Sequence, residues 1–163
     1  RSDRPWRSRL NAFDPFSESF WISVGAAVLC GGVVGLERQV RGKPAGVRTS
    51  ILICLGTAVF IRLGASLAGP EADPTRVLGQ LVTGVGFLGA GVMFSREGTV
   101  VGVTTASVVW VLAATGAAIG FGLYASAIAL AFITVAILVG VEALESSVRW
   151  LARGVHGREQ SDG

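Results

Sequence analysis

The glycines Gly84, Gly86 and Gly89 form the most conspicuous chemical pattern in the chain, the string GVGFLG. This string matches the GxGxxG pattern with which many proteins bind a dinucleotide. That pattern works where a strand turns into a helix whose N-terminus meets a pyrophosphate. Here the glycines, with Gly91 soon after them, lie inside an apolar run of membrane-spanning length. The string therefore indicates no nucleotide site.

Close helix packing is the first of two accounts of these glycines, because small residues let membrane helices approach one another. Gly86 and Ala90 form a small-xxx-small step. Gly31–Gly35 and Gly116–Gly120 are full GxxxG steps of the same kind. The second account is a broken helix whose exposed carbonyls line a polar cavity, as in transporters near the bilayer midplane.

Arg62 is the one charge that falls well inside an apolar run. A charged side chain at the bilayer centre costs about 2.5–3.5 kcal/mol on insertion scales, so such residues are functional candidates. By helical rise, however, Arg62 lies only about 9 Å from the outer end of its run. Its long side chain could reach the interface and meet Glu71 or Asp73. A buried role and an interfacial role both remain open.

Asp73, Arg76 and Gln80 lie at the start of the glycine-rich run. Asp73 precedes a proline, which is typical of a helix cap. Arg76 and Gln80 are four residues apart and share one helix face. A capped, solvated helix end explains Asp73 but not a glutamine inside the membrane. The alternative is an outward-facing polar vestibule that these residues form with Arg62.

A second polar set brackets a short basic loop on the other predicted side of the membrane: Glu37, Arg38, Arg48 and Thr49. Such loops mostly set orientation or bind anionic lipid headgroups. Glu142 and Glu145 lie one helical turn apart after the last apolar run and could pair with the loop arginines. A carboxylate pair could also hold Mg²⁺ through water, although two helical glutamates usually form a solvated face.

Residues for catalysis are sparse. The single histidine, His156, lies in the polar tail, and no serine has a base at a recognisable spacing. Cys30 and Cys54 lie in apolar runs, where small packing residues are the simplest interpretation. The net charge of +3 comes from basic residues at the ends of apolar runs, which fits membrane orientation rather than nucleic-acid binding. We expect no enzymatic activity and no cofactor.

Five apolar runs must position these residues. Hydrophobic residues make up 51% of the chain and charged residues 15%, and the mean hydropathy is +0.61. Helices are expected, because hydrocarbon leaves a bare backbone group without a partner. The predicted fold is an all-α polytopic membrane bundle over residues 20–141, between a polar segment 1–19 and a tail 142–163. Its five predicted spans are at about residues 20–36, 49–68, 77–94, 104–120 and 123–141.

Local signals predict where three of these helices begin. Asp14-Pro15 and Asp73-Pro74 each resemble an N-cap followed by proline at the first helical position. Thr104 or Thr105 is the expected cap of the fourth span. The stretch between the third and fourth spans is expected to be a loop.

The charges of the loops predict the orientation of the bundle. Five spans place the termini on opposite sides of the membrane. The loop 37–48, the loop 95–103 and the C-terminal tail together carry more Lys and Arg than the other side does. The positive-inside rule then places the N-terminus outside and the C-terminus in the cytoplasm.

Three segments together resemble the MgtC/SapB family of bacterial inner-membrane proteins. They are GLERQVRGKPAGVRTSILICLGTAVF (35–60), DPTRVLGQLVTGVGFLGAGVMF (73–94) and VGVTTASVVWVLAATGAAIG (101–120). Their combination, in this order, is far more specific than any one piece. The family motifs fall here on Glu37, Arg38, Arg48, Thr49, Asp73, Arg76, Gln80, Gly84, Gly86, Gly89, Gly91, Thr104 and Thr105.

The resemblance implies a protein of the inner membrane with about five spans. It also implies a link to magnesium limitation and, in pathogens, to survival inside host cells. Family members are usually described as regulators that act on membrane partners, including the F-type ATP synthase. Virulence-type members carry a further cytoplasmic domain after the last span, so this chain resembles the short, SapB-like form.

Three functions are compatible with these observations. The first is a non-enzymatic membrane regulator in magnesium or stress adaptation that acts through helix–helix contact. The second is a small oligomeric transporter of an ion, such as Mg²⁺, or of a solute, built around the polar set of Arg62, Asp73, Arg76 and Gln80. The third is a structural subunit without activity of its own. A homo-oligomer or a membrane-protein partner is expected in the first two.

Overall fold

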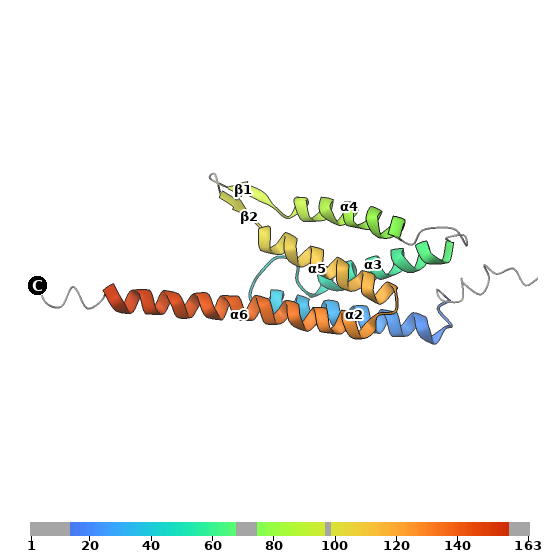
Figure 1. Cartoon of the computed structure of the whole chain (residues 1–163), viewed down its shortest axis with the longest axis horizontal. Coiled ribbons are helices and arrows are strands. Elements are labelled where there is room, and N and C mark those ends of the chain that lie inside the picture. The colour runs from blue at the N-terminus through green and yellow to red at the C-terminus, as the bar shows by residue number, and fades with distance from the viewer. Residues whose placement is uncertain (1–13, 68–74, 97–98, 157–163) are drawn as a thin grey trace, which may run out of the picture.

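The computed structural model describes residues 14–67, 75–96 and 99–156, which form a bundle of helices with one small hairpin (Figure 1). The expected all-α bundle is confirmed. The helices are α2 (Glu18–Val40), α3 (Val47–Leu67), α4 (Thr75–Gly91), α5 (Val103–Gly120) and α6 (Tyr124–His156). The hairpin consists of β1 (Phe94–Arg96) and β2 (Thr99–Val101).

Four helices within the described residues are long and apolar enough to cross a membrane. They are α2, α3, α5 and the Tyr124–Leu144 part of α6. The third predicted span, 77–94, differs from the helix that forms there. α4 ends at Gly91, and its 17 residues rise about 25 Å, which is less than a hydrocarbon core of about 30 Å.

The segment after α4 folds as a hairpin rather than the expected loop. β1 and β2 are antiparallel, with Phe94 opposite Val101 and Ser95 opposite Val100. The prediction that the third span reaches residue 94 is therefore wrong. Backbone pairing with β2 holds Phe94 in an extended conformation, and this pairing depends on residues seven positions further along the chain.

The last helix continues well past the predicted end of the fifth span. α6 runs for 33 residues to His156, and Figure 1 shows it extending beyond the other helices. The segment 142–153 contains no glycine or proline and is rich in Ala, Leu, Glu and Arg, all good helix formers. The polar tail is thus helical through this segment.

The cap predicted at Asp14 is wrong. Ser17 is the N-cap of α2, and its hydroxyl accepts a hydrogen bond from the backbone N–H of Phe20 at 3.3 Å. The Asp14 carboxylate instead accepts from the N–H of Phe16 at 3.0 Å, within a turn that precedes the helix. Short polar side chains often form such local turns in competition with a helix. Asp73-Pro74 lies outside the described residues.

The cap predicted at Thr104 or Thr105 is also wrong. Gly102 is the N-cap of α5, with a φ of 95° and no side-chain cap. This left-handed conformation suits glycine, because a Cβ costs about 1–2 kcal/mol there. A Cβ at this position would also collide with the carbonyl oxygen of Val92. Thr105 is buried and serves a different purpose, described below.

α3 is packed between two helices that approach it through glycines. A Cβ built on Gly31 of α2 would lie 2.7 Å from the Cα of Ile51, closer than real Cβ atoms come to other atoms. A Cβ on Gly120 of α5 would lie 2.7 Å from the Cβ of Ile61. Gly35 and Gly116 make similar approaches to the α3 backbone. Both GxxxG steps are therefore internal packing surfaces.

The main core joins α2, α3, α5 and α6, while α4 lies against its side. Buried residues of the core are Ala27, Cys30, Val34, Cys54, Ala58, Val108, Leu112, Ile119, Ala127 and Ala131. Both cysteines are free, and the Cys54 thiol donates to the Leu112 carbonyl at 3.3 Å. A smaller cluster of Val85, Val109 and Ala113 holds α4 against α5. The hairpin and the far part of α6 lie at the same end of the bundle (Figure 1).

Candidate functional site

Arg38, near the C-terminal end of α2, is only 3% exposed. Its Nη2 donates to the Thr105 hydroxyl of α5 at 2.9 Å, and its Nε donates to the carbonyl oxygen of Pro44 at 3.4 Å. Its own carbonyl accepts from the N–H of Lys43 at 2.9 Å. A buried guanidinium is tolerated only where acceptors compensate for the lost water. Arg38 thereby joins α2, the α2–α3 loop and the start of α5.

Two carboxylates share one arginine next to Arg38. The Nε of Arg41 donates to Oε1 of Glu37 at 2.8 Å, and its Nη1 forms an ion pair with Glu142 of α6. The Glu37 side chain is 7% exposed, whereas that of Glu142 is about half exposed. Oε2 of Glu37 is buried and has no hydrogen-bond partner among the described residues.

These side chains line one wall of a cavity of about 710 Å³ at this end of the bundle. The other walls come from the hairpin, the start of α5 and the middle of α6. Its polar lining residues are Glu37, Arg38, Arg41, Lys43, Thr104, Thr105 and Glu142. Its large apolar lining residues are Val92, Phe94, Val100, Val101, Val103, Ile137, Leu138 and Val141. We call this space the hairpin cavity.

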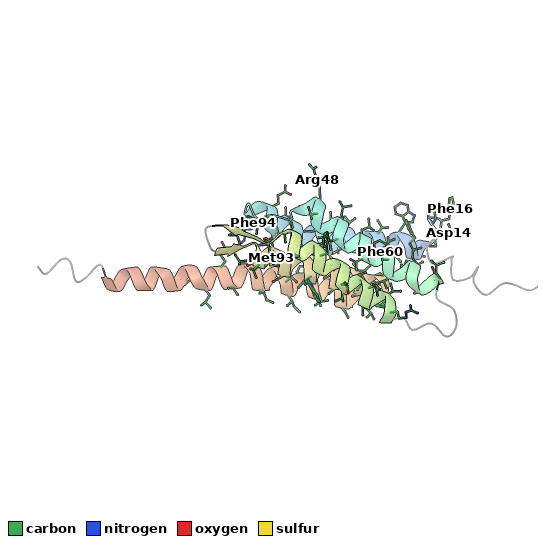
Figure 2. All side chains as sticks on the ribbon, turned by 90° about the horizontal axis from the view of Figure 1, so that it is seen from above. Asp14, Phe16, Arg48, Phe60, Met93 and Phe94 are labelled. Carbon is green, nitrogen blue, oxygen red and sulfur yellow. The ribbon has the colours of Figure 1, made fainter. Side chains whose placement is uncertain are left out.

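The second polar set predicted from the sequence is divided by the structure. Glu37 and Arg38 belong to the hairpin cavity. Arg48 is exposed at the start of α3, and Figure 2 shows its side chain projecting away from the bundle. Thr49 lines a different space, an apolar groove of about 610 Å³ between α3 and α4.

Arg62 lies at the opposite end of the bundle from Arg38, between the starts of α2 and α6. Its Nη1 donates to the carbonyl oxygen of Ser19 at 3.0 Å, and its Nη2 donates to the Tyr124 hydroxyl at 3.2 Å. The Tyr124 hydroxyl also lies 3.0 Å from that of Ser23. This half-buried arginine therefore links three helix ends through neutral oxygens.

The remaining members of the first predicted polar set lie on or before α4. Arg76 and Gln80 are both exposed on that helix, and Gln80 lines the groove between α3 and α4. Asp73, the expected cap, lies outside the described residues. The contacts described for Arg62 run to α2 and α6, so the vestibule that would join these residues stays a prediction.

The α4 glycines differ from those of α2 and α5. A Cβ on Gly84, Gly86 or Gly91 would meet nothing within 4 Å. A Cβ on Gly89 would make ordinary contact with the Cβ of Ala106, at 3.8 Å. Three glycines of the GVGFLGAG string therefore adjoin open space within this chain.

Arg41, Ser23 and Tyr124 take part in these polar contacts but are not among the site residues predicted from the sequence, whereas Thr105 is predicted only as a motif position and a candidate helix cap. Arg41 was only one of several basic residues in the loop, while Tyr124 is the sole tyrosine of the chain and opens the last apolar run. A single tyrosine at the end of an apolar run is a sequence feature that could have identified this residue as a polar contact. Glu142 was expected to pair with a loop arginine, and its partner is Arg41.

Comparison with known proteins agrees with the motifs. The model of the MgtC family matches residues 24–147. A protein of Escherichia coli (strain K12) named "Putative magnesium transporter YhiD" is 47% identical over 61% of this chain and 49% of its own length. Protein MgtC of Brucella abortus (strain 2308) is 43% identical over 68% of this chain and 46% of its own length.

Another relative is matched over a larger share of its own length. Protein SrpB of Synechococcus elongatus is 36% identical over 77% of this chain and 75% of its own length. The chain spans about half the length of the Escherichia coli and Brucella relatives. No solved structure matches this chain. The family model covers most of the sequence and the helices are those of a membrane protein, and so this chain is a member of the MgtC family.

Proposed function

We propose that this chain is a non-enzymatic protein of the bacterial inner membrane that takes part in magnesium homeostasis or stress adaptation. It acts by helix contact with another membrane protein. The magnesium link is supported by membership of the MgtC family and by a 47% identical relative whose name refers to magnesium transport. The mode of action is supported by the surface of α4.

The observation that carries this proposal is one exposed face of α4, which we call the α4 outer face. Phe87 on this face is 80% exposed. A Cβ on Gly79 or Gly86 would meet nothing within 4 Å. Small residues beside a large apolar one allow another helix to approach closely within a membrane. The α4 outer face consists of the exposed residues Gly79, Thr83, Phe87 and Ala90 and of the half-buried Gly86.

A leucine at Gly86 tests this contact. A Cβ there meets nothing within 4 Å, and the rest of the side chain enters a groove of about 440 Å³ beside Ala106 and Trp110 of α5, so only a small change in thermal stability is expected. Binding of the membrane partner is expected to fall by about tenfold or more, which corresponds to about 1.4 kcal/mol. The measurement is in-membrane cross-linking of a tagged copy, probed for F-type ATP synthase subunits and for a second copy of the chain.

Gly25→Leu is the matched control. Gly25 is exposed on α2, and a Cβ there also meets nothing within 4 Å. The same change on a different face is expected to leave cross-linking intact. Equal cross-linking by wild type and Gly86→Leu would rule out the α4 outer face as the contact.

A small oligomeric Mg²⁺ transporter is the second candidate. It is supported by the groove between α3 and α4, whose lining includes Thr49, Thr57 and Gln80 among apolar residues. Magnesium flux into liposomes that contain only the purified protein decides between the two. Flux that Gln80→Leu or Asp73→Asn abolishes, while Ser147→Ala leaves it unchanged, would support transport. Correctly inserted protein without flux would leave the partner-binding proposal.

A further inference from the structure

We propose that the hairpin cavity binds the headgroup of an aminophospholipid, a lipid whose headgroup carries both a phosphate and a primary ammonium. Oε2 of Glu37 accepts a hydrogen bond from the ammonium, and the basic side chains of Arg38 and Lys43 face the phosphate. This inference concerns a different surface from the α4 outer face and holds whether or not the proposed partner exists.

The unpartnered oxygen of Glu37 is the first argument. Its carboxylate is more than nine-tenths buried, and only Oε1 is engaged, by Arg41. A buried charged acceptor without a donor costs about 1–3 kcal/mol or more. Glu37 lines a cavity large enough for a small molecule, since ligand sites typically measure about 300–1,000 Å³. Oε2 is covered in this structure, so a ligand with an N–H donor would satisfy it once the Glu37 side chain turns toward the cavity.

The charges around the cavity are the second argument. Arg38, Arg41 and Lys43 outnumber the carboxylates of Glu37 and Glu142. A lone divalent cation would approach a net positive wall and would have to displace Arg41 from both carboxylates. A lone anion would meet the buried, unpaired oxygen of Glu37. A zwitterion satisfies both signs at once.

The apolar rim of the cavity is the third argument, and it selects a lipid over a soluble zwitterion. Phe94 and Val100 of the hairpin are 58% and 60% exposed, and Ile137 of α6 is 58% exposed. Figure 2 shows Phe94 beside Met93 at this end of the bundle. Such surface matches acyl chains, while the charged groups lie where the helix α2 ends. Basic pockets between membrane helices are known to receive lipid headgroups.

The test is lipid retention by the full chain. The protein is reconstituted into bilayers of equimolar phosphatidylethanolamine, phosphatidylcholine and phosphatidylglycerol, extracted in mild detergent and analysed by native mass spectrometry. Phosphatidylcholine has the same charges as phosphatidylethanolamine but no N–H donor. Wild type is expected to retain phosphatidylethanolamine about tenfold over phosphatidylcholine, the effect of one charge-assisted hydrogen bond.

Glu37→Gln and Glu142→Gln form a matched pair. Each removes one carboxylate from Arg41, but only Glu37→Gln alters the buried oxygen. Because Arg41 needs an acceptor, the amide oxygen of the new glutamine faces Arg41 and its NH₂ faces the cavity. The preference for phosphatidylethanolamine is expected to disappear in Glu37→Gln and to persist in Glu142→Gln.

Other results would overturn the proposal. These are equal retention of the two zwitterionic lipids, preferential retention of phosphatidylglycerol, or an equal loss in both variants. Displacement of the lipid by soluble phosphoethanolamine would show that the site recognises a soluble zwitterion. Mg²⁺ that binds in the absence of lipid and is lost only in Glu37→Gln would show a cation site.

Discussion

The polar residues of this chain act as connectors between segments that are distant in sequence. Arg38 joins α2 to Thr105, 67 residues away, and Arg62 joins α3 to Tyr124, 62 residues away. The acceptors described for both arginines are neutral oxygens: the Pro44 carbonyl and Thr105 hydroxyl for Arg38, and the Ser19 carbonyl and Tyr124 hydroxyl for Arg62. A charged hydrogen bond to a neutral group is worth more than a neutral pair. Each arginine therefore fixes a helix end with few charges placed in the membrane.

Replacing Arg38 by methionine tests this role. Methionine fills similar space but leaves the Thr105 hydroxyl and the Pro44 carbonyl without their donor. The expected loss of unfolding free energy is about 1–3 kcal/mol. For a chain of this size, each kcal/mol lowers the melting temperature by roughly 2–4 °C. The measurement is the thermal unfolding midpoint of the purified protein in detergent.

Arg48→Met is the matched control, because Arg48 is exposed at the start of α3. Its effect is expected to stay within about 0.5 kcal/mol. Identical midpoints for the two variants would show that the hydrogen bonds of Arg38 do not stabilise the fold.

Sequence reasoning could single out these residues but not all of their partners. Glu37, Arg38 and Arg62 are recognisable because a charge at the end of an apolar run, or inside it, needs an explanation. The sequence predicts a helix cap at Thr104 or Thr105, since Thr is common at that position. The true role of Thr105 depends on how α2 packs against α5. That packing is tertiary, and no local pattern encodes it.

At the scale of elements, glycines determine how closely the helices approach and how the turns close. Gly102 combines a positive φ with a close approach to Val92, whereas Gly122 has a φ of 79° and open space around it. Gly122→Ala is expected to cost about 1–2 kcal/mol, the conformational term alone. Gly102→Ala is expected to cost about 1–3 kcal/mol more, because the new methyl collides with a carbonyl oxygen. Thermal unfolding midpoints would show this difference, and equal midpoints would contradict it.

Gly116 and Gly140 provide a second comparison, on helices. A Cβ at Gly116 would collide with the backbone of Cys54 in α3, while one at Gly140 would meet nothing within 4 Å. Gly116→Ala is expected to destabilise the fold by about 1–3 kcal/mol through overpacking. Gly140→Ala is expected to stabilise α6 by about 0.5–1 kcal/mol. Thermal unfolding in detergent measures both changes, and a stabilising Gly116→Ala would show that α3 and α5 can separate without cost.

Elements that depend on local sequence patterns can be predicted, whereas elements that depend on pairing between distant residues cannot. The spans can be recognised from the sequence because continuous apolar runs of about 20 residues match the thickness of a bilayer, whether or not their side chains are buried in the protein. The end of α4 at Gly91 cannot be recognised in the same way. The hairpin that follows it pairs residues that are as apolar as those of the helix, so hydropathy does not mark the boundary. The sequence analysis predicts a loop that includes Val100 and Val101, although β-branched residues favour strands.

At the scale of the whole molecule, the path of the chain determines how often it crosses the membrane. α4 is shorter than the hydrocarbon core, so its length alone does not show a crossing. However, the start of α5 and the loop between α2 and α3 both line the hairpin cavity. The helices α3 and α5 therefore begin at the same end of the bundle. α3 leads away from that end of the bundle, and α4 must return the chain to it, as Figure 1 shows. The fold therefore predicts five crossings.

Cysteine labelling tests the number of crossings and the orientation together. The native Cys30 and Cys54 are free and buried, so their background reaction is expected to be small. Lys43→Cys and Ser147→Cys are expected on the cytoplasmic side, and Leu123→Cys, in the exposed turn before α6, on the outside. A membrane-impermeant maleimide should then label only Leu123→Cys in intact cells and all three after permeabilisation.

The pattern of labelling distinguishes a wrong orientation of the bundle from a wrong number of crossings. Labelling of only Lys43→Cys and Ser147→Cys in intact cells would mean that the charge count chose the wrong side, with the five crossings preserved. Labelling of Lys43→Cys and Leu123→Cys from the same side would mean that α4 does not cross. In that case α3 and α5 could not both span the membrane in the parallel packing in which Gly116 lies against Cys54 and Gly120 against Ile61. The orientation therefore rests on a modest excess of basic residues, whereas the number of crossings rests on helix packing.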